Sequence, residues 1–367
     1  MTPDIVIVGG GLVGCSAALH LARAGRRPLL LEVGRIGAAA SGVNFGGVRV
    51  QGRALFELPL ALRSRAIWDN LVDIVGTDCE YRRSGHLRLA KTPADLDAVA
   101  AYAEKVRPAG LDLEVIDGAE IRRRHPAFNA TLAGATWSAG DGQANPRLAG
   151  PAFARAARAA GAEIRDNAKV VAIEPVAAGF AVATADGQRV TVPQVINSAG
   201  AWAPDLAASL GDAAPGRAIY PNMVVTEPLP PLISCSLGTY GNGVYLRQVE
   251  RGNVVFGMGR GRLAAPDRAV PSAETSLAAM AEAAWLLPRL AHAHVIRTWT
   301  GIEGELADGQ PVIGPSPRHQ GLFHAFGLSG HGFQLAPAIG AVLAELATAG
   351  SSPTPLDGFS ITRFTAG

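Results

Sequence analysis

Three glycines and one glutamate near the start of the chain have the types and spacing of a dinucleotide-binding site. Gly9, Gly11 and Gly14 form a G-x-G-x-x-G motif after the apolar run 4–8, and Glu32 ends the next apolar run. The first glycine permits a tight turn, the second lets backbone N–H groups approach a pyrophosphate, and the third lets a helix pack closely on the strand. The glutamate can accept hydrogen bonds from both ribose hydroxyls and would repel a 2′-phosphate. These residues therefore indicate an adenine dinucleotide, FAD or NAD rather than NADP.

The motif also predicts the elements that must hold it, a strand, a turn, a helix and a second strand over residues 3–33. The N-terminus of such a helix carries a partial positive charge of roughly half a unit, which favours phosphate groups. Leu12 and Val13 stand at that N-terminus, so we count them among the cofactor-binding residues. A glycine turn without a ligand would not need every one of these elements in register.

Length and composition favour a large globular protein with more than one structural unit. The chain has 367 residues, 48% of them apolar and 17% charged, which suits two domains or one domain with a large insertion. Its net charge of +2 argues against a surface for nucleic acid. The three cysteines lie far apart and form neither a metal-binding nor a disulfide pattern, so no metal site is expected. With no long apolar run and no room for a signal peptide, we expect a cytoplasmic protein.

The pattern of elements predicts that the cofactor domain is discontinuous. Nucleotide-type elements recur late in the chain, and the stretches between them are rich in short strands. The predicted helices cover residues 55–74, 93–106, 151–160, 274–290 and 333–349. The predicted cofactor domain covers residues 1–80, 145–215 and 308–367, and the substrate domain covers residues 81–144 and 216–307.

Four segments together resemble a known family of flavoenzymes. They are the glycine motif with Glu32, residues 40–49, residues 195–202, and residues 308–314 leading to 327–333. In this order they are similar to the FAD-dependent amine oxidoreductases of the D-amino-acid oxidase, glycine oxidase and sarcosine oxidase superfamily. Residues 46–53 and 299–304 look most like the beta-type subunits of opine oxidases and of proline or hydroxyproline dehydrogenases. The resemblance implies a mixed α/β fold, a discontinuous Rossmann-like FAD-binding domain with an inserted antiparallel-sheet substrate domain.

The resemblance also implies where FAD would lie. Some family members tether FAD through a Cys or a His, but neither stands at the corresponding positions and the nearest cysteine is Cys235, so noncovalent binding is expected. The residues implied are Ala40, Ser41, Gly46, Gly47 and Val48 along the flavin and ribityl chain, Val171 beside the adenine, Ala199, Gly200 and Trp202 in the cofactor cleft, and Gly330, His331, Gly332, Phe333 and Gln334 at the pyrimidine edge of the flavin.

The reaction implied is hydride transfer from the amine carbon of a secondary or D-amino acid to flavin N5, which gives an imine. Such chemistry depends on positioning and electrostatics. Arg49 and Arg247 are the candidates to bind a substrate carboxylate, and Tyr245 lies beside Arg247. Glu303 stands where glycine oxidase-like members carry an arginine, so it favours a cationic group. Arg49 and His331 are the predicted catalytic residues, although each of these side chains also has a purely structural interpretation.

The electron acceptor and the reaction class have alternatives. Sarcosine oxidase-type members use a substrate-domain lysine to activate oxygen, but this chain has only Lys91, Lys105 and Lys169, and residues 255–260 contain none. The interpretation favoured is a dehydrogenase that passes electrons to a carrier or a partner subunit. If the protein is an oxidase instead, Arg260 could take the place of the lysine. The alternatives are an oxidase that produces hydrogen peroxide, an NAD-dependent oxidoreductase, and a noncatalytic FAD-containing electron-transfer subunit.

Overall fold

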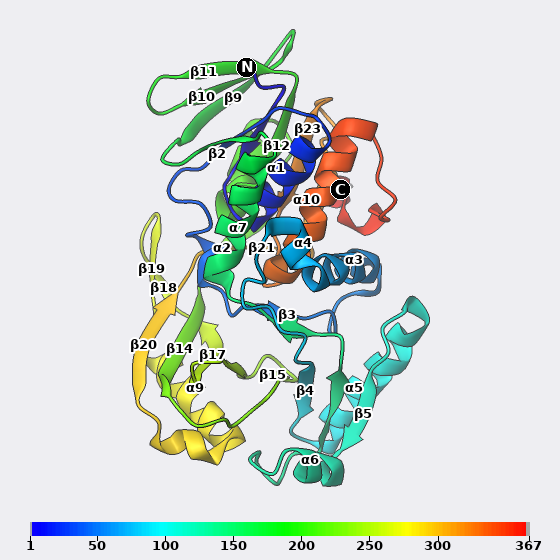
Figure 1. Cartoon of the computed structure of the whole chain (residues 1–367), viewed down its shortest axis with the longest axis vertical. Helices are drawn as coiled ribbons and strands as arrows, with labels where there is room; N and C mark the ends of the chain where they lie inside the picture. The colour runs from blue at the N-terminus through cyan, green and yellow to red at the C-terminus, as the bar shows by residue number, and fades with distance from the viewer. Residues whose placement is uncertain (1, 365–367) are drawn as a thin grey trace.

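The computed structural model describes residues 2–364, and two large sheets dominate it. Figure 1 shows the six-stranded sheet with its helices in the upper half of an elongated molecule and the eight-stranded sheet in the lower half. Between them lie α2 (Ala40–Val43) and β3 (Gly47–Val48). The segment predicted to follow the flavin therefore sits where the two halves meet.

The six-stranded sheet is built from strands that are far apart in the sequence. Its order is β22-β23-β12-β1-β2-β8, and all neighbours are parallel except β22 and β23. The central strands read as short continuous apolar runs, as expected for a parallel sheet that is covered on both faces. The strands are β1 (Ile5–Val8), β2 (Pro28–Leu31), β8 (Glu163–Arg165), β12 (Gln194–Asn197), β22 (Val312–Pro315) and β23 (Leu322–Phe326).

Each face of this sheet has its own core. On one face Ile5 and Ile7 pack with α1 (Leu12–Arg23), α7 (Pro146–Ala159) and α10 (Gly332–Ala349). On the other face Val6 and Val8 pack against a three-stranded antiparallel sheet. Alternating side chains of one strand thus enter two different cores. The three strands are β9 (Val170–Val176), β10 (Gly179–Thr184) and β11 (Arg189–Val192).

The last helix, α10, is packed inside the protein. Ser16 on α1 donates a hydrogen bond from Oγ to the carbonyl of Pro337 (2.9 Å). A Cβ on Gly340 would lie 2.4 Å from the Ser16 side chain, so only glycine permits this helix contact. Among the described residues, α10 is the one helix long and apolar enough to cross a membrane, and 72% of it is buried in the structure. That burial is the behaviour of a core helix.

The eight-stranded sheet has the order β20-β14-β17-β16-β15-β4-β6-β5. All neighbours are antiparallel except β4 and β15, which pair in parallel. Its outer face packs against α6 (Gly118–Arg124) and α9 (Ala273–Leu286) through residues such as Leu87 and Phe256. The strands are β4 (His86–Ala90), β5 (Glu114–Asp117), β6 (Gly134–Ser138), β14 (Pro221–Pro228), β15 (Ser236–Thr239), β16 (Tyr245–Gln248), β17 (Asn253–Arg260) and β20 (Val295–Thr300).

Shorter elements complete the fold. Three two-stranded sheets pair β3 with β7 (Gly142–Gln143), β13 (Gly216–Ile219) with β21 (Glu303–Leu306), and β18 (Arg262–Ala265) with β19 (Arg268–Val270). The remaining helices are α3 (Leu58–Asp69), α4 (Leu71–Val75), α5 (Pro93–Val106) and α8 (Ala203–Ser209), with short 3-10 turns at Leu55–Glu57, Arg107–Ala109, Gly200–Trp202, Pro288–His292, Asp357–Phe359 and Ile361–Phe364.

The predicted fold class is confirmed, with differences in detail. The substrate-side sheet is not purely antiparallel, since β15 runs parallel to β4. The helix expected over residues 151–160 starts at Pro146, because Asn145 accepts a hydrogen bond from the N–H of Arg147 (3.1 Å) and caps it. The helix expected over residues 55–74 is divided between α3 and α4. The domain boundaries stay a prediction.

Candidate active site

The glycine motif lies at the carboxyl ends of β1 and β12, where backbones approach too closely for side chains. Gly9 has φ +104°, and a Cβ there would lie 2.4 Å from the carbonyl oxygen of Ser198. A Cβ on Gly14 would lie 2.0 Å from the Gly9 carbonyl oxygen, so α1 can pack on the turn only with glycine at this position. Both glycines serve the roles that the motif predicts for them.

Glu32 is held in place by the turn that it faces. Its Oε2 accepts the N–H of Gly10 (2.6 Å), and its Oε1 accepts the N–H of Gly34 (2.8 Å). Because each carboxylate oxygen has two lone pairs, both remain able to accept a ribose hydroxyl. The side chain is oriented by the protein before any ligand arrives.

The predicted flavin loop joins the first motif through Ser41. The N–H of Leu12, at the start of α1, donates to Ser41 Oγ (2.8 Å). Asn44 then closes the loop, since its Nδ2 donates to the Ala40 carbonyl (2.9 Å) and its Oδ1 accepts the N–H of Gly46 (2.7 Å). Ala40, Ser41 and Gly46 are thereby part of one compact turn beside the glycine motif, and Val48, which follows Gly47 in β3, is fully buried.

The start of α10 supplies the other end of the predicted FAD site. Ser329 and Gly330 have φ values of +47° and +81°, a left-handed turn that directs the chain into the helix. The N–H of Leu335 donates to the His331 carbonyl (3.3 Å). The N–H groups of Gly332, Phe333 and Gln334 come before it, in the first turn of the helix. Such first-turn N–H groups are suited to an anionic edge.

The side chains of Phe333 and Gln334 point toward α3 instead. The Phe333 ring lies 4.9 Å from the Trp68 ring, and Gln334 Nε2 donates to the Ala61 carbonyl (2.8 Å). These two residues can therefore serve the cofactor through their backbone.

His331 forms a buried pair with Glu57. His331 Nδ1 lies 3.0 Å from Glu57 Oε1, and the Glu57 side chain is fully buried. Burial and the charge of Arg53 lower the pKa of His331 to about 4, although Glu57 opposes this shift. Burial acts to raise the pKa of Glu57, but the hydrogen bonds from His331 and from the N–H of Ala54 outweigh burial and lower that pKa. Glu57 is therefore a carboxylate, and it accepts a hydrogen bond from the protonated Nδ1 of His331. Neutral His331 consequently offers an acceptor at Nε2.

The other predicted cofactor residues come from the turn after β12 and from β9 of the three-stranded sheet. Ala199 and Gly200 follow β12, Gly200 with φ +60°, and the Trp202 side chain is 41% exposed. Val171 is exposed on β9, shortly after Ala168, whose N–H donates to the Glu32 carbonyl (2.8 Å). Both apolar side chains are thus accessible near the motif.

The inner face of the eight-stranded sheet presents Tyr245 and Arg247 toward the flavin loop. The Tyr245 ring makes an edge contact with Phe45, with centroids 5.0 Å apart, and the Arg247 guanidinium lies 5.6 Å from the same ring. A Cβ on Gly46 would lie 2.7 Å from Arg247 Nη2. Arg247 is 7% exposed, and its Nε is buried without a hydrogen-bond partner. Burial lowers the pKa of Arg247 to about 10.

Glu303 adds a carboxylate beside Tyr245. It begins β21, and burial together with the charge of Glu303 raises the pKa of Tyr245. Within the described residues the Glu303 side chain makes no hydrogen bond or ion pair, and burial raises its pKa to about 7. The end of β20, which precedes it, is fixed to α2, since Trp299 Nε1 donates to the Val43 carbonyl (2.7 Å).

Arg49 lies in different surroundings from Arg247. Its guanidinium is partly buried and donates to the Gln51 carbonyl. The N–H groups of Val50 and Gln51 donate to the carboxylate of Asp141 (2.9 and 3.1 Å), which fixes this stretch after β3. Tyr245 and Arg247 thus share contacts with Phe45, and Glu303 acts on Tyr245, whereas Arg49 lies farther along the flavin loop.

Sequence reasoning missed three charged residues in this region, the buried Glu57 and Arg53 and the half-buried Arg88. The alternation of residues 86–89 carried a signal for Arg88, because Leu87 and Leu89 enter the outer core and leave His86 and Arg88 on the inner face. No comparable local pattern identifies Glu57, whose partner His331 is 274 residues away.

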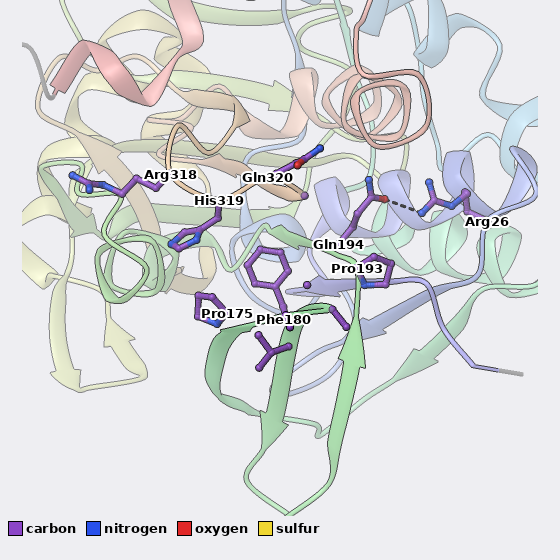
Figure 2. A pocket seen from close by; sticks show the side chains of 13 residues that line it. Arg26, Pro175, Phe180, Pro193, Gln194, Arg318, His319 and Gln320 are labelled. Carbon is purple, nitrogen blue, oxygen red and sulfur yellow. Dashed lines mark hydrogen bonds between the residues drawn. The ribbon is translucent and has the colours of Figure 1, made fainter.

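A cavity of about 620 Å³ is remote from these residues. Figure 2 shows it between the β9–β10 turn and the loop Arg318–Gly321, with Arg26 donating to Gln194 Oε1 (2.8 Å). Gln194 begins β12 and Gly321 precedes β23, so the cavity opens at the amino ends of the parallel strands. The glycine motif and Glu32 lie at the carboxyl ends, where ligands of such sheets bind. This cavity is not the candidate active site.

Comparison with known proteins gives one consistent family. The family model described as FAD dependent oxidoreductase (DAO) matches residues 4–346. An opine oxidase subunit of Rhizobium meliloti is 30% identical over 99% of this chain and 98% of its own length. The crystal structure of glycine oxidase from Geobacillus kaustophilus superposes with a TM-score of 0.91 at 29% identity, covering 98% of both chains. L-proline dehydrogenase from P. horikoshii superposes with a TM-score of 0.93 at 26% identity, covering 99% of this chain and 98% of its own. The chain belongs to the DAO family of FAD-dependent oxidoreductases.

Proposed function

We propose that this flavoenzyme oxidises a secondary or D-amino acid at its carbon–nitrogen bond. The observation that carries the proposal is that two groups of opposite charge lie near Tyr245, namely Arg247 on the inner face of the substrate-side sheet and Glu303 at the start of β21. Glu303 is a carboxylate without a partner among residues 2–364, and Arg247 is a buried guanidinium with a free Nε. An amino acid has an ammonium group and a carboxylate, the two charges that these side chains would neutralise.

In the proposed mechanism the protein positions the substrate and manages one proton. FAD supplies the acceptor for a hydride from the amine carbon. Arg247 and Arg49 are the candidates to hold carboxylate groups, and Glu303 holds the ammonium. With a pKa of about 7, the Glu303 carboxylate can also take the ammonium proton, which leaves the neutral amine that hydride transfer needs. Phe45 and Tyr245 form an apolar wall beside these charged groups.

The cofactor would be held noncovalently by the residues that the sequence identifies. The three cysteines are buried and unpaired, and burial raises the pKa of each thiol, which makes them poor nucleophiles for attachment. Backbone N–H groups of the glycine motif and of the α10 start, together with Glu32 and Ser41, are the proposed contacts. Buried, reduced cysteines also agree with the proposed cytoplasmic location.

We propose that the electrons pass to a carrier or a partner subunit rather than efficiently to oxygen. Lys91 is paired with Glu282 (2.6 Å), and β17 contains no lysine. Arg260, the candidate substitute, is paired with Glu305 (2.9 Å). The opine oxidase relative is by its name a subunit, one component of a larger enzyme, which supports a partner for this chain.

Anaerobic mixing with a panel of amines tests the function directly. The holoenzyme should show the flavin absorbance near ~450 nm. We expect bleaching of that band by at least one of proline, hydroxyproline, sarcosine, D-amino acids or N-(carboxyalkyl) amino acids. Reoxidation should be fast with a dye acceptor and slow with oxygen, whereas rapid peroxide formation would identify an oxidase. Absence of bleaching with every amine would refute the proposed function and favour an electron-transfer subunit.

A further inference from the structure

Two half-buried guanidinium groups, those of Arg49 and Arg88, approach each other across Gly52. A Cβ on Gly52 would lie 2.5 Å from Arg49 Nη1 and 2.6 Å from Arg88 Nη1. The two nitrogens are therefore separated by roughly 5 Å at most, a distance at which like charges repel strongly away from water. The side chains come from different parts of the fold, one from the flavin loop and one from β4.

Neither guanidinium has an acidic partner within the described residues. Arg88 stacks on the rings of Tyr102 and Tyr240, with its Cζ 5.9 and 5.2 Å from their centroids, and no carboxylate acts on it. The acids that act on Arg49 are Asp141 and Glu57.

Both of those acids are bound to other groups. Asp141 accepts the N–H groups of Val50 and Gln51, and Glu57 accepts His331 and the N–H of Ala54. The positive charge of the two arginines is consequently left without a dedicated counterion.

A third arginine strengthens the positive field. Arg53 is 3% exposed, and its Nε and Nη1 are buried without partners, while its Nη2 donates to the Arg49 carbonyl (3.0 Å). The pKa of nearby His86 lies well below its ordinary value because of burial and because of the charges of Arg49, Arg88 and Arg53. Burying such N–H donors without a hydrogen-bond acceptor costs free energy, and a bound ligand can supply the acceptor.

The sheet register connects this cluster with the proposed amine site. Gly238 on β15 pairs with Tyr245 on one side and with Arg88 on the other. Strands are spaced by about 4.8 Å, so the Cα atoms of Tyr245 and Arg88 are about 10 Å apart along one row. Gly238 has no side chain, which leaves the surface low between them. One end of this row has the acid Glu303 beside Tyr245, and the other end has arginines.

We propose that Arg49 and Arg88 form a subsite for a second carboxylate of the substrate, remote from its amine. The preferred substrate class is then an amino diacid, an N-substituted amino acid whose ammonium group lies toward Glu303 and whose distal carboxylate lies toward Arg88. The inference rests on the proposed function and adds to it the chemistry of the far end of the substrate. Planar guanidinium groups bind carboxylates through two parallel hydrogen bonds, and the tyrosine rings hold Arg88 in position.

Matched substrates and a matched variant test this subsite in the holoenzyme. N-(2-carboxyethyl)glycine and N-propylglycine differ in a terminal carboxylate at equal chain length. We expect wild-type kcat/KM to favour the diacid by about tenfold or more, and Arg88→Gln to remove most of that preference. Arg107→Gln, which changes an exposed arginine paired with Glu104, should keep the wild-type ratio. No preference in the wild type, or a preference that Arg88→Gln leaves intact, would overturn the subsite.

Equilibrium binding separates the subsite from the reaction and from the cofactor. Calorimetry with glutarate and with pentanoate needs no oxidation, so it is informative even if no amine is oxidised. Arg88→Gln should lower the affinity for glutarate by about tenfold and the affinity for pentanoate much less. If the arginines instead serve the flavin, Arg88→Gln will weaken FAD binding to the apoprotein and leave the glutarate-to-pentanoate ratio unchanged, and that result would also overturn the proposal.

Discussion

At the scale of single residues, Glu303 is a carboxylate without a hydrogen-bond or ion-pair partner among residues 2–364. Its neighbour Glu305 on the same strand is different, since Arg217 and Arg260 bind it at 2.6 and 2.9 Å. Burial without a cation raises the pKa of Glu303 to about 7, so it is half-protonated near neutral pH until a cation arrives. The unliganded site therefore favours the binding of a cationic group.

The substitution Glu303→Gln should weaken a cationic ligand selectively. Trimethylglycine has no proton on nitrogen to lose, and 3,3-dimethylbutanoate is its isostere in which an uncharged carbon replaces the ammonium nitrogen. We expect the variant to have an affinity for trimethylglycine lower by about tenfold and an affinity for 3,3-dimethylbutanoate that is nearly unchanged. Calorimetry on the holoenzyme measures both affinities. In the wild type the affinity for trimethylglycine should fall as the pH drops through about 7, because the carboxylate is protonated.

The control for that prediction is Glu305→Gln, which should leave both affinities and the pH dependence unchanged. The pKa of Glu303 is raised in the folded state, so the unliganded protein loses stability as the pH rises from 4.5 through about 7. Glu303→Gln should therefore melt higher than the wild type at pH 8. An equal loss of affinity for both ligands in Glu303→Gln would mean that the carboxylate only supports the fold.

At the scale of elements, the end of β20 is attached to α2, which joins the substrate-side sheet to the flavin loop. Trp299 donates to the Val43 carbonyl, and a Cβ on Gly301 would lie 2.3 Å from the Val43 side chain. Movement of one element must accordingly move the other.

We predict that Trp299→Phe, which keeps an aromatic ring and removes the donor, will loosen this attachment. Losing one hydrogen bond should cost about 1 kcal/mol and lower the melting temperature by roughly 2 °C. FAD affinity, measured by fluorescence titration of the apoprotein, should fall several-fold because α2 carries Ser41 of the cofactor cradle. Trp285→Phe, on the exposed side of α9, is the matched control and should change neither quantity. An unchanged FAD affinity in Trp299→Phe would contradict the coupling.

The elements also show how far sequence reasoning reached. The glycine motif and Glu32 were predictable because their roles are local, and the helix over residues 93–106 was predictable because Thr92 caps it with Asp95. The predicted start of α7 was wrong because Asn145 caps the helix one turn earlier than the apolar pattern indicated. The row Tyr245–Gly238–Arg88 could not be predicted, because it depends on β15 pairing in parallel with β4, a strand from a distant part of the chain.

At the scale of the whole molecule, the proposed FAD site joins segments that span nearly the entire chain. The Gly9 turn, the Ser41 loop and the α10 start belong to opposite ends of the sequence and meet around one sheet. A ligand that contacts all of them must stabilise the fold as a unit.

Added FAD should consequently raise the melting temperature of the apoprotein, with an increase that grows with the logarithm of FAD concentration. NAD should have little effect at the same concentration, since it lacks the isoalloxazine ring expected to contact the α10 start. Differential scanning fluorimetry in an FAD and an NAD series measures both. A larger shift with NAD than with FAD would be evidence against the proposed site.

The contact between α1 and α10 has a consequence for how the enzyme is made. Ser16 on α1 is near the start of the chain, while Pro337 and Gly340 on α10 lie near its end. During translation the first βαβ unit leaves the ribosome long before its partner helix exists, so the glycine turn is exposed and its helix lacks one side of its core. Cofactor loading must therefore wait until synthesis is almost finished, and a nascent chain stalled before residue 332 would be a client for chaperones rather than a flavoprotein.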